Sequence, residues 1–174
     1  MFVLNVGTIR TDHEHFDRVF QPQAFESGED GFRVAAPIEL SFDVRKDDDR
    51  FQLTGRVATT LELMCSRCLE PFEWAVDQPF DLRYLPDVGR QGSDDLEIQE
   101  DDFSTALYEN EEIDLGQLIR ERLYLSLPMK PLCRESCSGL CPQCGANLNR
   151  STCECRREWA DPRFAALRAL KKES

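Results

Sequence analysis

Eight cysteines are the residues of this chain whose type and spacing could do chemistry. They form four close pairs: Cys65/Cys68, Cys133/Cys137, Cys141/Cys144 and Cys153/Cys155. A closed tetrahedral zinc site takes four ligands, and a Cys-x-x-Cys turn lets both of its sulfurs reach one ion at about 2.3 Å. The eight thiols therefore predict two structural zinc ions per chain.

The sequence Cys141-Pro-Gln-Cys144-Gly145 is the most specific of these motifs. Proline fixes the backbone at the entry to the turn. Glycine after the second cysteine permits a positive φ and could expose its N–H to a thiolate. One such turn alone is weak evidence for metal, but four cysteine pairs that include this form are strong evidence.

Other uses of the cysteines fit less well. The N-terminus has neither a basic start nor a long apolar stretch, so it does not resemble a secretory signal. We expect a cytoplasmic protein with reduced thiols, which disfavours disulfides. A thioredoxin-like motif needs a strand-to-helix junction, whereas Cys65 and Cys68 lie between two predicted strands. An iron–sulfur cluster is a weaker alternative.

A catalytic zinc keeps one coordination position open and usually takes histidine or carboxylate ligands. The chain has only two histidines, His13 and His15, and both lie far from the cysteines in the sequence. We expect them to be ordinary surface residues. No glycine-rich phosphate loop and no assembled acid–base group accompanies them, so the sequence predicts no enzymatic activity.

Two groupings of the cysteine pairs remain open. In the first, Cys65, Cys68, Cys133 and Cys137 form site 1, while Cys141, Cys144, Cys153 and Cys155 form site 2. The second set spans only fifteen positions and could close locally, which favours this grouping. In the second, the two Cys-x-x-Cys turns face each other across one ion. Site 1 of the first grouping would close a long loop and so matter most for the main fold.

The charge of the chain limits its partners. The formal net charge is −12, and a four-thiolate zinc site adds to the negative charge, so a large non-specific RNA-binding face is not expected. Residues 133–174 hold eight Lys or Arg against five Asp or Glu. This small excess could be an ordinary mixed-charge surface. The candidates there for contact with RNA or a partner are Arg150, Arg156, Arg157 and Arg163.

The elements that must position the cysteines can be read from hydrophobic periodicity. Apolar residues alternate with polar ones over 38–44 and again over 51–63, which predicts an antiparallel hairpin. Alternation resumes over 72–84, so the first cysteine pair lies in the connection between two strands. Residues 87–112 are acidic and predict a loop, which is either solvated or a docking surface for a basic partner.

A main helix is predicted over 114–126. Asp114 is its N-cap, Gln117 completes a capping box, and Pro128 follows its end. A short C-terminal helix is predicted to begin at Asp161-Pro162. The predicted fold is α+β: a twisted antiparallel sheet with one main helix over 1–127, and a zinc-stabilised Cys-rich block with a C-terminal helix over 128–174.

Several motifs resemble the bacterial YceD family, which is linked to accumulation of large-subunit ribosomal RNA. They are CSRCLEPF at 65–72, IDL at 113–115, LSLP at 125–128, GLCPQCGANLN at 139–149 and DPRF at 161–164. The resemblance implies a role in synthesis, processing or stability of 23S rRNA and brings no catalytic activity with it. Family members that lack the 139–149 motif keep the first cysteine pair, which favours the grouping of site 1 given above.

These observations predict a zinc-binding, non-enzymatic factor in large-subunit biogenesis. Its acidic balance favours a ribosomal protein or a maturation factor as the partner, with direct rRNA contact through the C-terminal block as the lesser alternative. No membrane and no small-molecule substrate is expected. The competing hypothesis is a thiol- or zinc-responsive regulatory protein that acts through protein–protein contacts.

Overall fold

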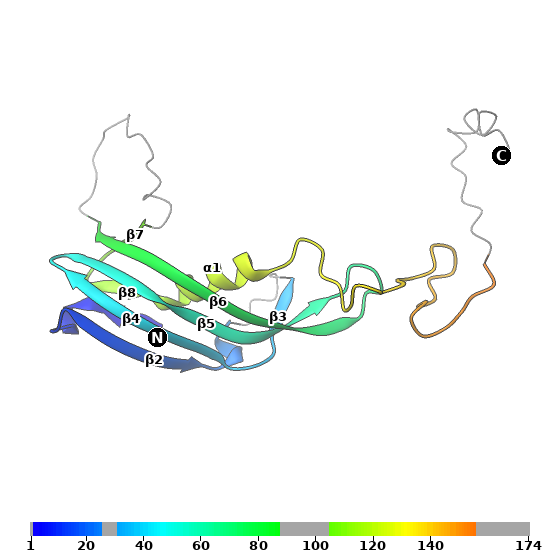
Figure 1. The fold of residues 1–174 in the computed structure, drawn as a ribbon, viewed down its shortest axis with the longest axis horizontal. Coiled ribbons are helices and arrows are strands. Elements are labelled where there is room, and N and C mark those ends of the chain that lie inside the picture. The colour runs from blue at the N-terminus through cyan, green and yellow to red at the C-terminus, as the bar shows by residue number, and fades with distance from the viewer. Residues whose placement is uncertain (1, 26–30, 88–104, 156–174) are drawn as a thin grey trace, which may run out of the picture.

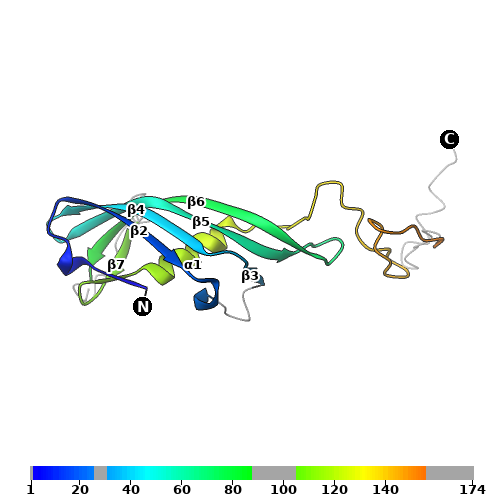
Figure 2. The same cartoon turned by 90° about the horizontal axis from the view of Figure 1, so that it is seen from below.

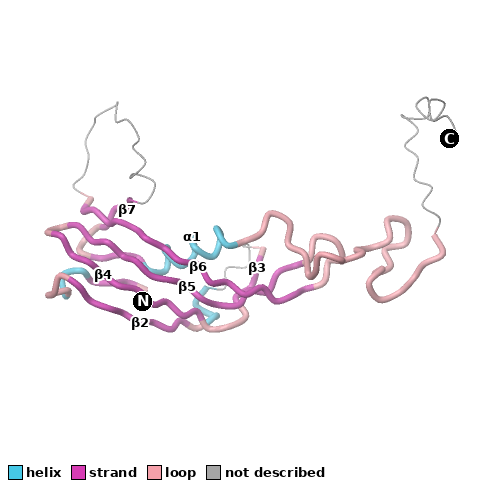
Figure 3. Tube along the Cα trace, viewed as in Figure 1, coloured by secondary structure: helices cyan, strands magenta, loops and turns pink. Residues whose placement is uncertain are grey.

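The computed structural model describes residues 2–25, 31–87 and 105–155. Its strands are β1 (Val3–Asn5), β2 (His13–Phe20), β3 (Phe32–Val34), β4 (Ile38–Asp47), β5 (Arg50–Met64), β6 (Pro71–Pro86), β7 (Thr105–Tyr108) and β8 (Glu112–Asp114). Its helices are α1 (Leu115–Ser126) and the short 3-10 turns η1 (Val6–Thr8) and η2 (Pro22–Phe25). The fold is therefore α+β with one main helix, as predicted (Figures 1 and 3).

A six-stranded sheet forms the body of the molecule. Five strands follow the order β2-β4-β5-β6-β7, and β3 pairs with the far end of β5. Strands β1 and β8 form a separate two-stranded sheet. All of these pairings are antiparallel except β6–β7, which is parallel. The predicted antiparallel arrangement is confirmed from β2 to β6, and the sheet departs from it at one edge, where β7 lies parallel to β6.

The predicted hairpin and third strand are confirmed. Alternate residues of β4 and β5 are buried, and β6 continues the pattern. These side chains belong to the same core cluster as the buried residues of α1, and α1 lies along one side of the sheet (Figure 2). Fully buried members of this core include Ile38, Leu40, Phe42, Val44, Leu53, Val57, Leu61, Leu118 and Ile119. Burial of each large aliphatic side chain stabilises the fold by about 1.5–3 kcal/mol.

Helix α1 begins where the sequence predicted. The Asp114 carboxylate accepts hydrogen bonds from the backbone N–H groups of Gly116, at 2.7 Å, and Gln117, at 3.0 Å. The capping box is incomplete, because the Gln117 side chain donates to Glu121 one turn later, at 2.9 Å. A partner at i+4 on the same helix face competes with the return bond to the cap.

Other predictions were wrong or lie outside the described residues. Strand β2 was not predicted, and β7 and β8 interrupt the predicted acidic loop. Residues 88–104 of that loop and the predicted helix from Asp161 lie outside the described residues. Within the described residues, no helix combines the length and the apolar character needed to span a membrane.

The β5–β6 hairpin extends well beyond β4, and its turn follows directly after the residues of β5 that pair with β3. β6 pairs with β5 as far as Met64, whereas β4 pairs with β5 only from Arg50 to Ala58. The chain after α1 runs beside this extended tip and then continues beyond it (Figure 1). The hairpin thereby carries the first cysteine pair toward the later cysteines.

Candidate metal centre

Cys65 and Cys68 lie in the turn that joins β5 to β6. The Cys65 N–H donates to the carbonyl of Glu70 and the Leu69 N–H donates to the carbonyl of Cys65, each at 2.9 Å. The turn requires Leu69 to adopt a positive φ of 58°. We call this turn knuckle 1.

Cys141 and Cys144 lie in a second turn, knuckle 2, with the same backbone pattern. The Cys141 N–H donates to Ala146 at 2.8 Å, and the Gly145 N–H donates to the Cys141 carbonyl at 2.9 Å. Gly145 has a φ of 72°, as predicted. Its N–H was expected to point at sulfur and instead closes the turn on the carbonyl. The two knuckles therefore differ at the left-handed position, where one has leucine and the other glycine.

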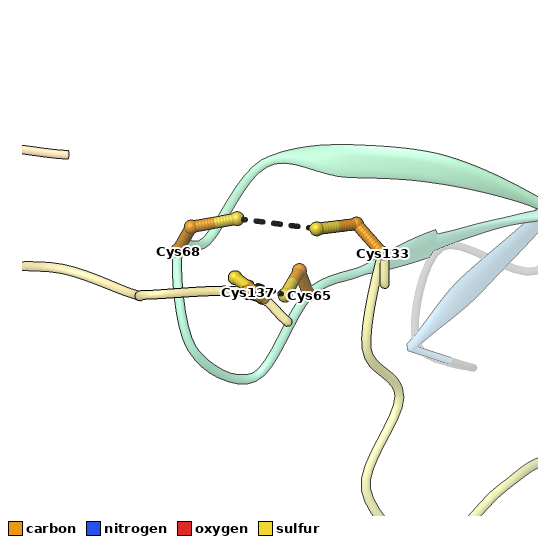
Figure 4. Close-up of side chains that lie close together, drawn as sticks. All are labelled: Cys65, Cys68, Cys133 and Cys137. Carbon is orange, nitrogen blue, oxygen red and sulfur yellow. Dashed lines mark hydrogen bonds between the residues drawn. The ribbon is translucent and has the colours of Figure 1, made fainter. Parts of the chain in front are cut away.

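Four thiols from distant parts of the chain meet at site 1. The Sγ atoms of Cys65 and Cys137 are 3.8 Å apart, as are those of Cys68 and Cys133 (Figure 4). A disulfide would need about 2.05 Å. Four sulfurs at about 2.3 Å from one central ion stand roughly 3.8 Å from one another. The spacing thus fits a single tetrahedral ion.

Site 2 is built from Cys141, Cys144, Cys153 and Cys155. Within each site the four Sγ atoms lie within 4.8 Å of one another. The structure thus divides the eight thiols into the same two sets as the first grouping, and it does not bring the two knuckles to one centre. Sulfur-only ligand sets of this kind suit zinc or iron. A multi-iron cluster needs more room between the thiolates than these distances leave.

The protein environment lowers the pKa of Cys65 and Cys137 in site 1 and of Cys141 in site 2. At Cys65, burial opposes ionisation, yet N–H groups of Cys133, Cys68 and Arg67 lower the pKa to about 6. At Cys141, N–H groups of Cys144 and Gln143 lower the pKa to about 6. Partial desolvation and the neighbouring thiols raise the pKa of Cys133 to about 12. A bound dication would have to displace the protons that such thiols retain.

Asn149 links the two sites. Its Nδ2 donates to the Sγ of Cys137 at 3.3 Å and to the Oδ1 of Asn147 at 2.9 Å. Its Oδ1 accepts from the Ser138 N–H at 2.8 Å and from the Arg134 guanidinium at 2.9 Å. A side chain between the ligands of site 2 therefore contacts a ligand of site 1. Such bonds to a ligand sulfur hold its orientation and tune its affinity for metal.

Arg67 makes the second link, from inside knuckle 1. Its guanidinium donates to the carbonyls of Cys137 at 2.9 Å and Glu135 at 3.2 Å, and its own carbonyl accepts the Leu140 N–H at 3.1 Å. Gly139 has a φ of 73°, and it lies so close to knuckle 1 that a Cβ at this position would stand 3.0 Å from the Arg67 carbonyl oxygen. The roles of Arg67 and Asn149 were not predicted from the sequence. The available signal was their position within the two cysteine motifs.

The remaining predicted contact residues are only partly described. Arg150 forms an ion pair with Glu70 at 2.7 Å, with 74% of its side chain exposed. Arg156, Arg157 and Arg163 lie outside the described residues. His13 and His15 are on the surface, as expected.

Comparison with known proteins identifies the group to which this arrangement belongs. The family model described as large ribosomal RNA subunit accumulation protein YceD matches residues 53–171, from β5 through both cysteine sites. The chain belongs to the YceD family. Members so named include chloroplastic YCED homologue 1 of Arabidopsis thaliana, which is 29% identical over 158 residues, covering 79% of this chain and 49% of the relative.

Two further relatives extend the comparison. YCED homologue 1 of Zea mays, also described as chloroplastic, is 32% identical over 149 residues, covering 72% of this chain and 51% of the relative. An uncharacterised protein of Bacillus subtilis is 27% identical over 165 residues, covering 91% of this chain and 88% of that protein. The chain spans about half the length of the two plant relatives. No solved structure matches it at a significant level.

Proposed function

We propose that this protein is a zinc-binding, non-enzymatic factor that supports accumulation of 23S rRNA and formation of the large ribosomal subunit. Its membership of a family named for large ribosomal RNA subunit accumulation carries the proposal. The two four-cysteine groups support the zinc part.

The sites favour a structural role for the metal. Each set supplies four sulfurs, which completes a tetrahedron and leaves no position for a substrate or water. Site 1 also connects the turn after β5 to the segment after α1, so its ion would fasten two parts of the fold that no strand pairing joins. Binding energy at such a site contributes directly to folding.

The partner we propose is a ribosomal protein or a large-subunit maturation factor, because basic proteins complement a chain with a net charge of −12. The test is depletion of the protein from cells, followed by measurement of the 23S to 16S rRNA ratio and of subunit profiles on a gradient. The proposal predicts a lowered ratio and fewer large subunits. Unchanged ratios after complete depletion would refute it.

A thiol- or zinc-responsive regulator is the second candidate. It is favoured by the exposure of one ligand in each site, Cys133 and Cys144, since exposed thiolates are the ones that oxidants reach. Alkylation of the zinc-loaded protein separates the two functions. A regulator should lose metal at mild oxidant doses, whereas a structural protein should keep all eight thiols protected until a chelator is added.

A further inference from the structure

One face of the six-stranded sheet is not covered by α1. The buried residues of β4, β5 and β6 point to the helix, so the residues between them line the opposite, open face. Most of these side chains are polar, and they are exposed or half-buried. The open face is therefore a solvent-facing platform that the proposed metal chemistry does not use.

The strand register sets several basic groups in one row on this platform. His13 of β2 is opposite Arg45 of β4, Arg45 is opposite Gln52 of β5, and Gln52 is opposite Arg83 of β6. Arg50 precedes Gln52 by two residues in β5 and therefore lies on the same face of the sheet. With strands about 4.8 Å apart, Arg45 and Arg83 stand roughly 10 Å from each other across the sheet.

These residues line a groove of about 980 Å³. Four of its lining residues are Lys or Arg, namely Arg45, Lys46, Arg50 and Arg83, against the two carboxylates of Asp12 and Asp47. Arg45 and Arg50 are exposed, and neither forms an ion pair with any residue that the structure describes. The groove is thus a local cationic site in a protein whose net charge is −12. We call it the Arg45 groove.

We propose that the Arg45 groove binds the phosphate backbone of RNA. Guanidinium groups present planar pairs of N–H donors that match phosphate oxygens. Contacts of this kind are independent of base sequence, and the salt dependence of binding reports how many phosphates the protein neutralises. The proposal rests on the proposed function, because it gives an rRNA-associated factor a direct contact with RNA.

An acidic protein segment is a poorer occupant. Protein interfaces depend on apolar or aromatic anchors that fill pockets at their centre. Phe51, the aromatic residue of the groove, is buried beneath it, with the Lys46 ammonium 5.8 Å from its ring centre. The one aromatic residue of the groove is therefore not available as an anchor, whereas its four cationic side chains supply the contacts that a phosphate backbone requires.

The test uses the full-length, zinc-loaded chain and a fluorescently labelled single-stranded RNA of about 20 nucleotides, with binding followed by anisotropy over a salt series. The variant is Arg45→Gln/Arg50→Gln. The matched control is Arg18→Gln/Arg120→Gln, which makes the same charge change at residues that lie over the rings of Phe16 and Phe25. Thermal unfolding of both variants establishes that they are folded.

Removal of two phosphate contacts should reduce the slope of log K against log salt by about 1.4 and weaken binding roughly 60-fold at about 50 mM salt. The control should stay within about twofold of the parent. Equal affinities of variant and control would overturn the proposal, and so would polyglutamate competing as well as an RNA of equal charge. This result is independent of the depletion experiment: a lowered 23S ratio together with equal RNA affinities would leave the proposed function standing and remove only the groove.

Discussion

The side chain of Asn149 offers the sharpest test of how the two cysteine sites depend on each other. Asn149→Asp keeps the acceptor oxygen that bonds Ser138 and Arg134, but it replaces the amide that donates to Cys137 and Asn147 with a carboxylate oxygen that cannot donate. Asn149→Ala removes all four side-chain hydrogen bonds. The two variants therefore separate the bond to the ligand sulfur from the docking of the segment that carries site 2.

The expected sizes follow from these bonds. Loss of a hydrogen bond to a metal ligand typically lowers metal affinity 10- to 100-fold, so Asn149→Asp should weaken site 1 by about that factor and leave site 2 within about twofold. In Asn149→Ala, the two bonds to Oδ1 are lost as well, at about 1 kcal/mol each. We therefore expect the segment from 139 to 155 to loosen in that variant.

Competition with a chromophoric chelator measures the two zinc affinities, and limited proteolysis between knuckle 2 and residue 138 reports docking. Ser151→Ala is the control, because among the described residues its hydroxyl bonds the Asn147 carbonyl, at 3.3 Å, and no cysteine. A role of Asn149 in holding the Cys137 ligand is refuted if Asn149→Asp keeps the site 1 affinity of the parent, or if it weakens site 2 as much as site 1.

Three further predictions use other parts of the fold. Leu69→Gly should raise the unfolding free energy by about 0.5 kcal/mol, because relief of a left-handed conformation worth about 1–2 kcal/mol exceeds the entropy cost of glycine. Equilibrium denaturation measures this change in unfolding free energy. A loss of stability would contradict backbone strain at Leu69. Gly55→Ala should lower the unfolding free energy by about 3 kcal/mol in the same assay, because its Cβ would stand 2.3 Å from the Ser41 carbonyl oxygen on β4. An unchanged unfolding free energy would show that β4 and β5 separate easily. The Asp43 carboxylate raises the pKa of His15, so this pair stabilises the fold below the unfolded histidine pKa of about 6.5 and its contribution disappears as pH rises through the folded pKa. An NMR titration should therefore find the His15 pKa lowered by Asp43→Asn, and an unchanged value would exclude this contact.

Much of the sheet could be predicted because its central strands are half-buried. Phe42 and Leu53 belong to runs in which every second residue is apolar, and that period is the signature of a strand with one buried face. Strand β2 lacks the signature, since only Phe16 and Phe20 among its residues pack against the core. An edge strand can be held by backbone pairing with β4 alone, which leaves little trace in its composition.

Part of the candidate metal centre could likewise be predicted from the sequence, and part could not. The short spacing within each cysteine pair predicted eight ligands, because a short loop keeps two sulfurs close enough to bind the same ion. Their grouping followed from loop closure and from the family resemblance, and the structure brings the same sets together. Asn149 and Arg67 could not be assigned from the sequence, because their roles depend on how segments distant in the chain lie side by side. Metal ligation itself and the division at residue 127 stay predictions.

The position of knuckle 1 at the tip of the β5–β6 hairpin has a consequence for synthesis of the chain. Cys65 and its partner Cys137 are 72 positions apart, so a nascent chain presents two of the four ligands of site 1 long before the others exist. Adjacent strands can pair as soon as they are made, whereas this site can be completed only after α1 and the segment behind it have emerged. Loading of site 1 then follows formation of the sheet and α1, and a chain truncated before Cys133 would keep a sheet with an unfastened end.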